Sequence, residues 1–226
     1  MKNIIFIAPP AAGKGTQARL VSDKYKIPHI STGDLLRDEV LANTSYGKML
    51  KNQMDSGELI NNETIFHLLR NRINQVDCNN GYILDGFPRS VEQAMIYDNL
   101  LKELQREIGT VIFINIDRGL ALERTLSRLI CSSCFASYNM SIPDLRPKIE
   151  GICDKCGHML RTRGEDNIET FPATFNNYLK EIKPILEYYN QKGLLRVVNV
   201  EKTDTVNDVF NKIVSQINIG GERWKM

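Results

Sequence analysis

The segment that most constrains the fold of this chain lies near its N-terminus, at residues 4–24. An apolar stretch at residues 4–7 has the composition of a buried strand, and residues 17–24 have the pattern of a helix. Between them lies a turn of small residues that contains Lys14. Such an arrangement surrounds a phosphate with backbone N–H groups, and the helix dipole and Lys14 add positive potential. We therefore predict a phosphate-binding loop, with an ordinary strand-to-helix turn as the alternative.

The remainder of the chain alternates strand-like and helix-like stretches. Apolar runs at residues 81–84, 110–116 and 195–200 are each followed by a segment with helical periodicity. This alternation predicts an α/β fold of the P-loop type, with a doubly wound parallel sheet of about five strands. Two stretches interrupt it, one with short helical patterns and one that is polar and bears four cysteines. The predicted division is a core at 1–29, 68–125 and 165–220, a helical insert at 30–67 and a cysteine-bearing insert at 126–164.

Charge and hydropathy exclude several classes of partner. The 226-residue chain has a formal net charge of +2, which does not indicate an extended basic surface for nucleic acid. The sequence has no apolar run near the roughly 18 residues of a membrane-spanning helix, and residues 1–7 are too short for a signal sequence. We expect a cytoplasmic protein without nucleic-acid or membrane partners.

The cysteines indicate a metal site. Four of the five form two Cys-x-x-Cys pairs, Cys131 with Cys134 and Cys153 with Cys156, separated by 18 residues. This spacing is typical of structural zinc sites, in which four thiolates complete a tetrahedral shell and leave no position for a reacting water. The segment between the pairs is too polar to bury a core of its own, so Zn²⁺ would supply folding energy. Disulfides or an Fe–S cluster are the alternatives.

Charged residues outside the loop also suit phosphate chemistry. Asp85 follows the predicted strand at 81–84, and a carboxylate at the carboxyl end of a strand beside a phosphate loop can hold the waters of Mg²⁺. Arg124 and Arg128 are four residues apart in a stretch with a helical pattern. At that spacing both would lie on one helix face, an arrangement that suits a polyphosphate. A solvated helix face is the alternative.

Three strings of the sequence carry a family resemblance. Residues 13–17 (GKGTQ), 31–37 (STGDLLR) and 85–89 (DGFPR) resemble the nucleotide-binding segments of adenylate kinases, and the cysteine pairs resemble the zinc lid of the bacterial forms. The resemblance covers essentially residues 1–215. It implies a monomeric nucleoside-monophosphate kinase that transfers a phosphoryl group from ATP to AMP with Mg²⁺. The helical insert would then bind the nucleoside monophosphate, and the cysteine-bearing insert, called the lid below, would close over ATP.

The resemblance also implies roles for individual residues, with Asp85 at the Mg²⁺ site. The expected catalytic cations are Lys14, Arg89, Arg128 and Arg163. The expected ATP-binding residues are Ala11, Ala12, Gly13, Lys14, Gly15, Thr16, Arg124, Tyr138 and Val200. The expected AMP-binding residues are Thr32, Arg37, Ile60, Gly86, Arg89 and Gln93. Gln93 has a second interpretation, because Ser90-x-x-Gln93 also forms a capping box at a helix start.

Four positions depart from the family pattern. Ala8 and Ala11 replace glycines, and Leu129 and Thr174 replace arginines. If the backbone at position 11 is left-handed, alanine costs about 1–2 kcal/mol there. The departures leave two alternatives open: a nucleotide-binding protein with a weakly active or inactive site, and a kinase for another nucleoside monophosphate. The donor preference, ATP or GTP, is also open.

Overall fold

A five-stranded parallel sheet forms the centre of the computed structural model, which describes residues 2–42, 45–55, 61–162, 164 and 166–218. The strand order is β2-β3-β1-β4-β8, and each neighbouring pair is parallel. The strands are β1 (Lys2–Ile7), β2 (His29–Ser31), β3 (Ile83–Asp85), β4 (Glu107–Ile116) and β8 (Leu195–Val200). The predicted doubly wound fold is confirmed. The short strand β2 was not predicted as a strand, because its first residues carry no apolar run.

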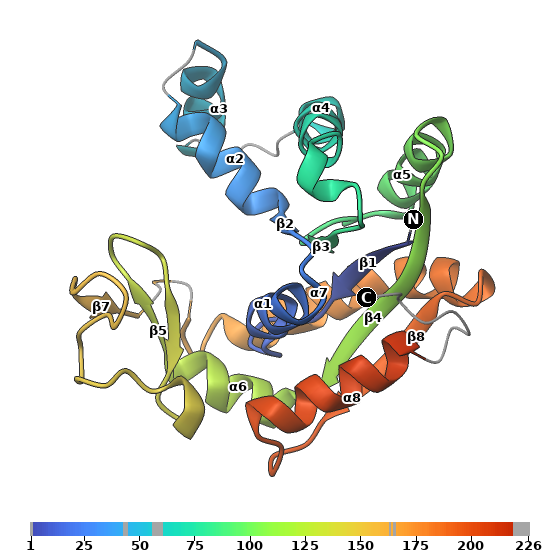
Figure 1. Cartoon of the computed structure of the whole chain (residues 1–226). Coiled ribbons are helices and arrows are strands. Elements are labelled where there is room, and N and C mark those ends of the chain that lie inside the picture. Colours follow the sequence, from blue (N-terminus) through green and yellow to red (C-terminus); the bar gives the residue numbers. More distant parts are fainter. Residues whose placement is uncertain (1, 43–44, 56–60, 163, 165, 219–226) are drawn as a thin grey trace.

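Helices cover both faces of the sheet, as Figure 1 shows with α1 and α8 in front and α7 behind. Alternate residues of β1 point to opposite faces, so Ile4 and Phe6 enter one hydrophobic cluster and Ile5 and Ile7 the other. The first cluster includes residues of α1, α6 and α8, and the second includes residues of α4, α5 and the later part of α7. These helices are α1 (Lys14–Tyr25), α4 (Asn62–Ile73), α5 (Val91–Glu103), α6 (Arg118–Leu126), α7 (Phe171–Gln191) and α8 (Val206–Asn218).

The predicted helical insert contains α2 (Thr32–Leu41), α3 (Ser45–Asp55) and the start of α4. The Ser31 hydroxyl accepts a hydrogen bond from the backbone N–H of Asp34 and caps α2, and the Asn61 side chain caps α4 in the same way. Because Ser31 is also the last residue of β2, the sheet itself positions the start of α2. A short 3-10 helix, Val76–Cys78, follows α4.

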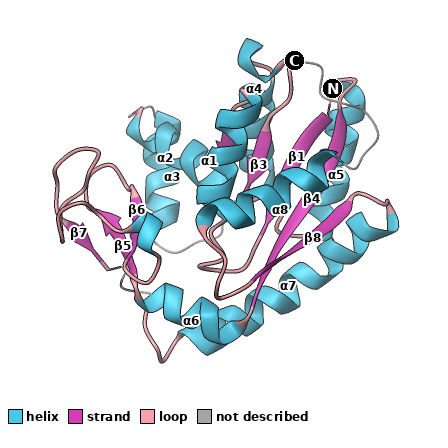
Figure 2. Cartoon of the chain, turned by 60° about the horizontal axis from the view of Figure 1, so that its bottom comes forward, coloured by secondary structure: helices cyan, strands magenta, loops and turns pink. Residues whose placement is uncertain are grey.

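The lid has a sheet of its own, which the sequence analysis did not predict. Three antiparallel strands, β5 (Arg128–Cys131), β6 (Ser137–Asn139) and β7 (Leu160–Arg161), pair in the order β6-β5-β7, with a 3-10 turn at Pro143–Leu145. A small core that includes Cys131, Tyr138 and Cys153 supports this sheet. Figure 2 shows the lid at the side of the molecule that also holds α2 and α3. Among the described residues, no helix is both long and apolar enough to cross a membrane.

Candidate active site and metal centre

The phosphate loop has the backbone that its role requires. Ala11 and Gly13 have φ angles of 62° and 88°, so both lie in the left-handed region. The backbone of Ala11 is therefore left-handed. This is the condition under which an alanine at position 11 was expected to cost about 1–2 kcal/mol. Gly13 is the N-cap of α1, and no side chain caps this helix end. The first N–H groups of α1 are thus available to an anion, and Lys14 lies beside them.

The carboxylate of Asp85 joins two strands to this loop. Asp85 is the last residue of β3, and its side chain accepts Lys14 Nζ at 2.7 Å and lies 3.1 Å from His29 Nε2. Burial alone would raise the pKa of Asp85, but His29 and Lys14 outweigh it and hold the pKa below its ordinary value. His29 is a residue that the sequence analysis missed, because its contact depends on the unpredicted strand β2, which pairs His29 with the start of β3.

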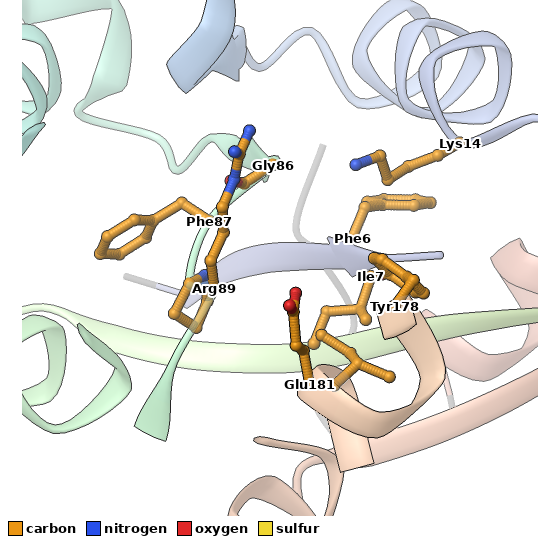
Figure 3. A pocket seen from close by; sticks show the side chains of 10 residues that line it. Phe6, Ile7, Lys14, Gly86, Phe87, Arg89, Tyr178 and Glu181 are labelled. Carbon is orange, nitrogen blue, oxygen red and sulfur yellow. The ribbon is translucent and has the colours of Figure 1, made fainter. Parts of the chain in front are cut away.

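A cavity of about 260 Å³ lies next to Lys14. Figure 3 shows Lys14 and Arg89 at the cavity together with Glu181 of α7. The backbone oxygen of Gly86 joins Thr32 to Arg89, since it accepts hydrogen bonds from Thr32 Oγ1 at 3.2 Å and from Arg89 Nε at 3.0 Å. Gly86 has a φ of 78°, and a Cβ there would lie 3.2 Å from Thr32 Oγ1. The structure therefore brings Thr32, Gly86 and Arg89 together near Lys14.

Gln93 lies in the first turn of α5, at the position for which the sequence allowed two interpretations. Its backbone N–H donates to the Ser90 hydroxyl at 3.1 Å, which is the helix cap. Its side chain does not complete a capping box with Ser90; it accepts from the backbone N–H of Arg89 at 2.7 Å and donates to Asn62 Oδ1 at 2.7 Å. The amide thus links Arg89 to the start of α4. Its role in adenine recognition stays a prediction.

The two arginines expected on one helix face are separated in the structure. Helix α6 ends at Leu126 with Ser127 as its C-cap, and Arg128 begins strand β5. The prediction of a shared helix face is wrong, because the chain leaves the helix to pair with β6 and form the lid sheet. Arg124 is buried next to the phosphate loop, where desolvation lowers its pKa in spite of the nearby charges of Asp204 and Glu123.

Arg128 instead reaches the segment that precedes α7. Its Nε donates to Asp166 Oδ2 at 2.8 Å, and its Nη2 pairs with Asp166 Oδ1. The pair lies at the base of the lid. Arg37, on α2, forms a similar ion pair with Asp34.

Other expected site residues lie away from the cavity next to Lys14 or outside the described residues. Val200 ends β8 and is buried in the first hydrophobic cluster. Thr174, at a position where an arginine was expected, donates its hydroxyl to the backbone oxygen of Thr170 at 3.1 Å. Arg163 and Ile60 lie outside the described residues. The loop residues Ala12, Gly13 and Thr16 line a second, smaller hollow together with Arg124.

The four paired cysteines converge at one point of the lid. Their sulfur atoms all lie within 4.8 Å of one another, and none of the four forms a disulfide. A Zn–S distance of about 2.3 Å places tetrahedral sulfurs about 3.8 Å apart. The Cys131–Cys156 and Cys134–Cys153 sulfur distances are 3.4 and 3.6 Å. The donor set therefore fits one tetrahedral ion, and disulfides do not describe it.

Tyr138 lies at this cluster. Its hydroxyl is 3.5 Å from the sulfur of Cys153 and accepts the backbone N–H of Asp154 at 2.8 Å. The hydrogen bond from Tyr138 lowers the pKa of the Cys153 thiol to about 6, which favours the thiolate that binds metal. This arrangement favours a structural role for the Tyr138 side chain over the expected ATP contact.

Comparisons with known proteins agree with the geometry. A family model described as adenylate kinase matches residues 6–194. An adenylate kinase of Clostridium tetani is 41% identical over 211 residues, which is 93% of this chain and 96% of that protein. One of Clostridioides difficile is 40% identical over 96% of this chain and 99% of its own length. One of Archaeoglobus fulgidus is 41% identical over 93% of this chain and 95% of its own length.

Proposed function

The chain belongs to the adenylate kinase family, and we propose from its site that it catalyses the reversible transfer ATP + AMP = 2 ADP. It is a phosphotransferase of the nucleoside-monophosphate kinase class. The observation that carries the proposal is the cavity of about 260 Å³ that Lys14 and Arg89 share. Lys14 comes from the donor loop and Arg89 from the acceptor segment, so a phosphoryl group between the two nucleotides would contact both.

The reaction requires alignment and charge neutralisation rather than proton transfer. The attacking oxygen of AMP is already ionised, so no general base is needed. Lys14 and the N–H groups of α1 would bind the donor phosphates, while Arg37 and Arg89 would bind the acceptor phosphate. Arg124, Arg128 and Arg163 would add positive charge from the lid side. Held in line, the two polyanions react without the entropy loss of a free encounter.

Mg²⁺ bound with ATP would neutralise charge on the donor phosphates. Asp85 fits this ion, because its carboxylate oxygens are the ligand type that Mg²⁺ or its waters prefer, and Asp85 lies at the loop beside Lys14. Closure of the lid and of the helical insert would expel water that could otherwise accept the phosphoryl group. A single chain would supply both nucleotide sites, which supports a monomeric enzyme. We also propose that the enzyme acts in the cytoplasm.

We also propose that the four cysteines hold a structural Zn²⁺. Four sulfur ligands at tetrahedral spacing leave no open coordination position, so the ion would stabilise the lid and take no part in the chemistry. The zinc would join the two loops that carry the Cys-x-x-Cys pairs, and the lid could then move as one rigid body.

A panel of nucleotides tests the proposed reaction. We expect ADP formation from ATP with AMP, and much slower turnover when UMP, CMP or GMP replaces AMP, because the amide of Gln93 offers the donor and acceptor that adenine requires. ATP and GTP would be compared as donors. Binding of ATP and AMP without turnover would instead favour a degraded site, consistent with the hydrogen-bonded Thr174 at an expected arginine position.

A further inference from the structure

Acidic partners accompany the cations of the proposed phosphate site. Three of these cations form an ion pair within the described part of the chain: Lys14 with Asp85, Arg37 with Asp34, and Arg128 with Asp166. Arg89 differs, because its Nε donates to the backbone oxygen of Gly86, which carries no net charge. Arg89 is also exposed, so its guanidinium remains open to a further acidic group.

Glu181 is an acidic residue that lines the same cavity as Lys14 and Arg89. It lies on α7, and Figure 3 shows its carboxylate directed into that cavity. Among the residues that the structure describes, Glu181 forms no ion pair or hydrogen bond. Lys14 is already matched by Asp85 at 2.7 Å, so the carboxylate of Glu181 adds an unpaired negative charge to the cavity.

The surrounding helix fixes Glu181 in this position. Its neighbour Ile182 is buried in the second hydrophobic cluster, which sets the rotation of this turn of α7. One turn earlier, Tyr178 lines the same cavity as Lys14 and Arg89. The packing of α7 therefore holds Glu181 beside the cavity.

We propose that the unpaired carboxylate of Glu181 lowers nucleotide affinity by repelling the acceptor phosphate in the cavity that it lines together with Lys14 and Arg89. This inference rests on the proposed function of the cavity. AMP must place its phosphate beside Arg89 and also near a carboxylate that no ion pair balances among the described residues. At the dimensions of this cavity, such repulsion weakens the binding of a doubly charged phosphate about threefold to tenfold. The same repulsion speeds nucleotide release, a step that often limits turnover in enzymes with lids.

Calorimetric titration of the full chain tests the inference with AMP and adenosine as probes. For Glu181→Gln we expect the Kd for AMP to fall about threefold to tenfold relative to the wild-type protein. Adenosine lacks the phosphate, so its Kd should be unchanged. The gain for AMP should shrink at 0.5 M salt, because the field of an exposed carboxylate is screened over about 4–5 Å there. Glu187→Gln is the matched control: Glu187 is exposed on the same helix, pairs with Lys183, and should leave AMP binding unchanged.

Glu181→Asp separates charge from size, because it keeps the carboxylate on a shorter side chain. We expect its Kd for AMP to stay close to that of the wild type. The inference is overturned if Glu181→Gln binds AMP no more tightly than the wild type, or if Glu181→Asp gains as much as Glu181→Gln. Either result leaves the proposed function intact, since ADP formation by the wild-type enzyme is measured separately.

Discussion

Arg128 and Asp166 are joined by two hydrogen bonds although 38 residues separate them in the sequence. The Asp166 side chain is only 4% exposed and that of Arg128 only 17% exposed, so the pair is largely removed from water. Arg128 opens the lid sheet, and Asp166 lies just before α7 returns the chain to the core. The Asp166 carboxylate balances the charge of Arg128, which we place near the phosphates. The same contact fixes the positions of both side chains.

Replacement of Arg128 by lysine should lower kcat about 100-fold, because one ammonium cannot hold Asp166 through two bonds and also reach a phosphate. Steady-state kinetics with ATP and AMP measure the effect. Arg118→Lys is the control, since Arg118 is exposed at the start of α6 and should retain full activity. A loss of less than threefold in Arg128→Lys would remove Arg128 from the catalytic set.

Ala11→Gly should stabilise the protein, because it relieves the left-handed strain at φ 62°. The relief of about 1–2 kcal/mol is partly offset by the greater freedom of glycine in the unfolded chain, so we expect a net gain of about 0.5–1 kcal/mol in the free energy of unfolding. Urea denaturation measures it. Ala12→Gly is the control: Ala12 is buried and is not among the residues with positive φ, so this change should destabilise.

The depressed pKa of Asp85 predicts a particular acid sensitivity. Its folded-state pKa lies below the ordinary value of 3.8, so the ionised form stabilises the fold fully above that value. This stabilisation is lost as the pH falls below about 3.8 through the folded-state pKa. Urea denaturation between pH 6 and pH 3 should therefore show a steeper loss of unfolding free energy in the wild-type protein than in Asp85→Asn. Parallel curves for the two proteins would contradict the ion-pair account.

Cys153→Ser should release the metal and lower the melting temperature, because three thiolates no longer complete the tetrahedral shell. We expect a purified wild-type protein to contain about one zinc per chain and the variant to contain far less, with a fall in Tm of about 5 °C or more. Elemental analysis and calorimetry provide the two measurements. Cys78→Ser serves as the control, since Cys78 is buried outside the cluster beside Arg72 and should leave the zinc content unchanged. An equal zinc content per chain in Cys153→Ser and in the wild type would contradict the proposed zinc site.

The features that sequence reasoning recovered are those set by local chemistry. The phosphate loop follows from a strand, small residues and Lys14, and the strain at Ala11 follows from one side chain at a position that requires a left-handed backbone. The convergence of the cysteines follows from their spacing.

What sequence reasoning missed depends on contacts between distant segments. Strand β2 is only three residues long and forms because β3 pairs with it, so His29 gave no signal. The lid strands have only two to four residues each. The helical periodicity at Arg124 continues in the sequence through Arg128, so it hides the start of β5. Only the pairing of β5 with β6 shows that the helix must stop before Arg128.

The contact between Arg128 and Asp166 also bears on how such enzymes diversify. It brings the entrance and the exit of the lid to a common neck, so everything beyond that neck can be exchanged without rebuilding the sheet. A shorter flap could be grafted onto this neck, and Lys14 and Asp85 would keep their places on the central sheet and its loop. The lid can then change during evolution while the central sheet and the phosphate loop stay the same.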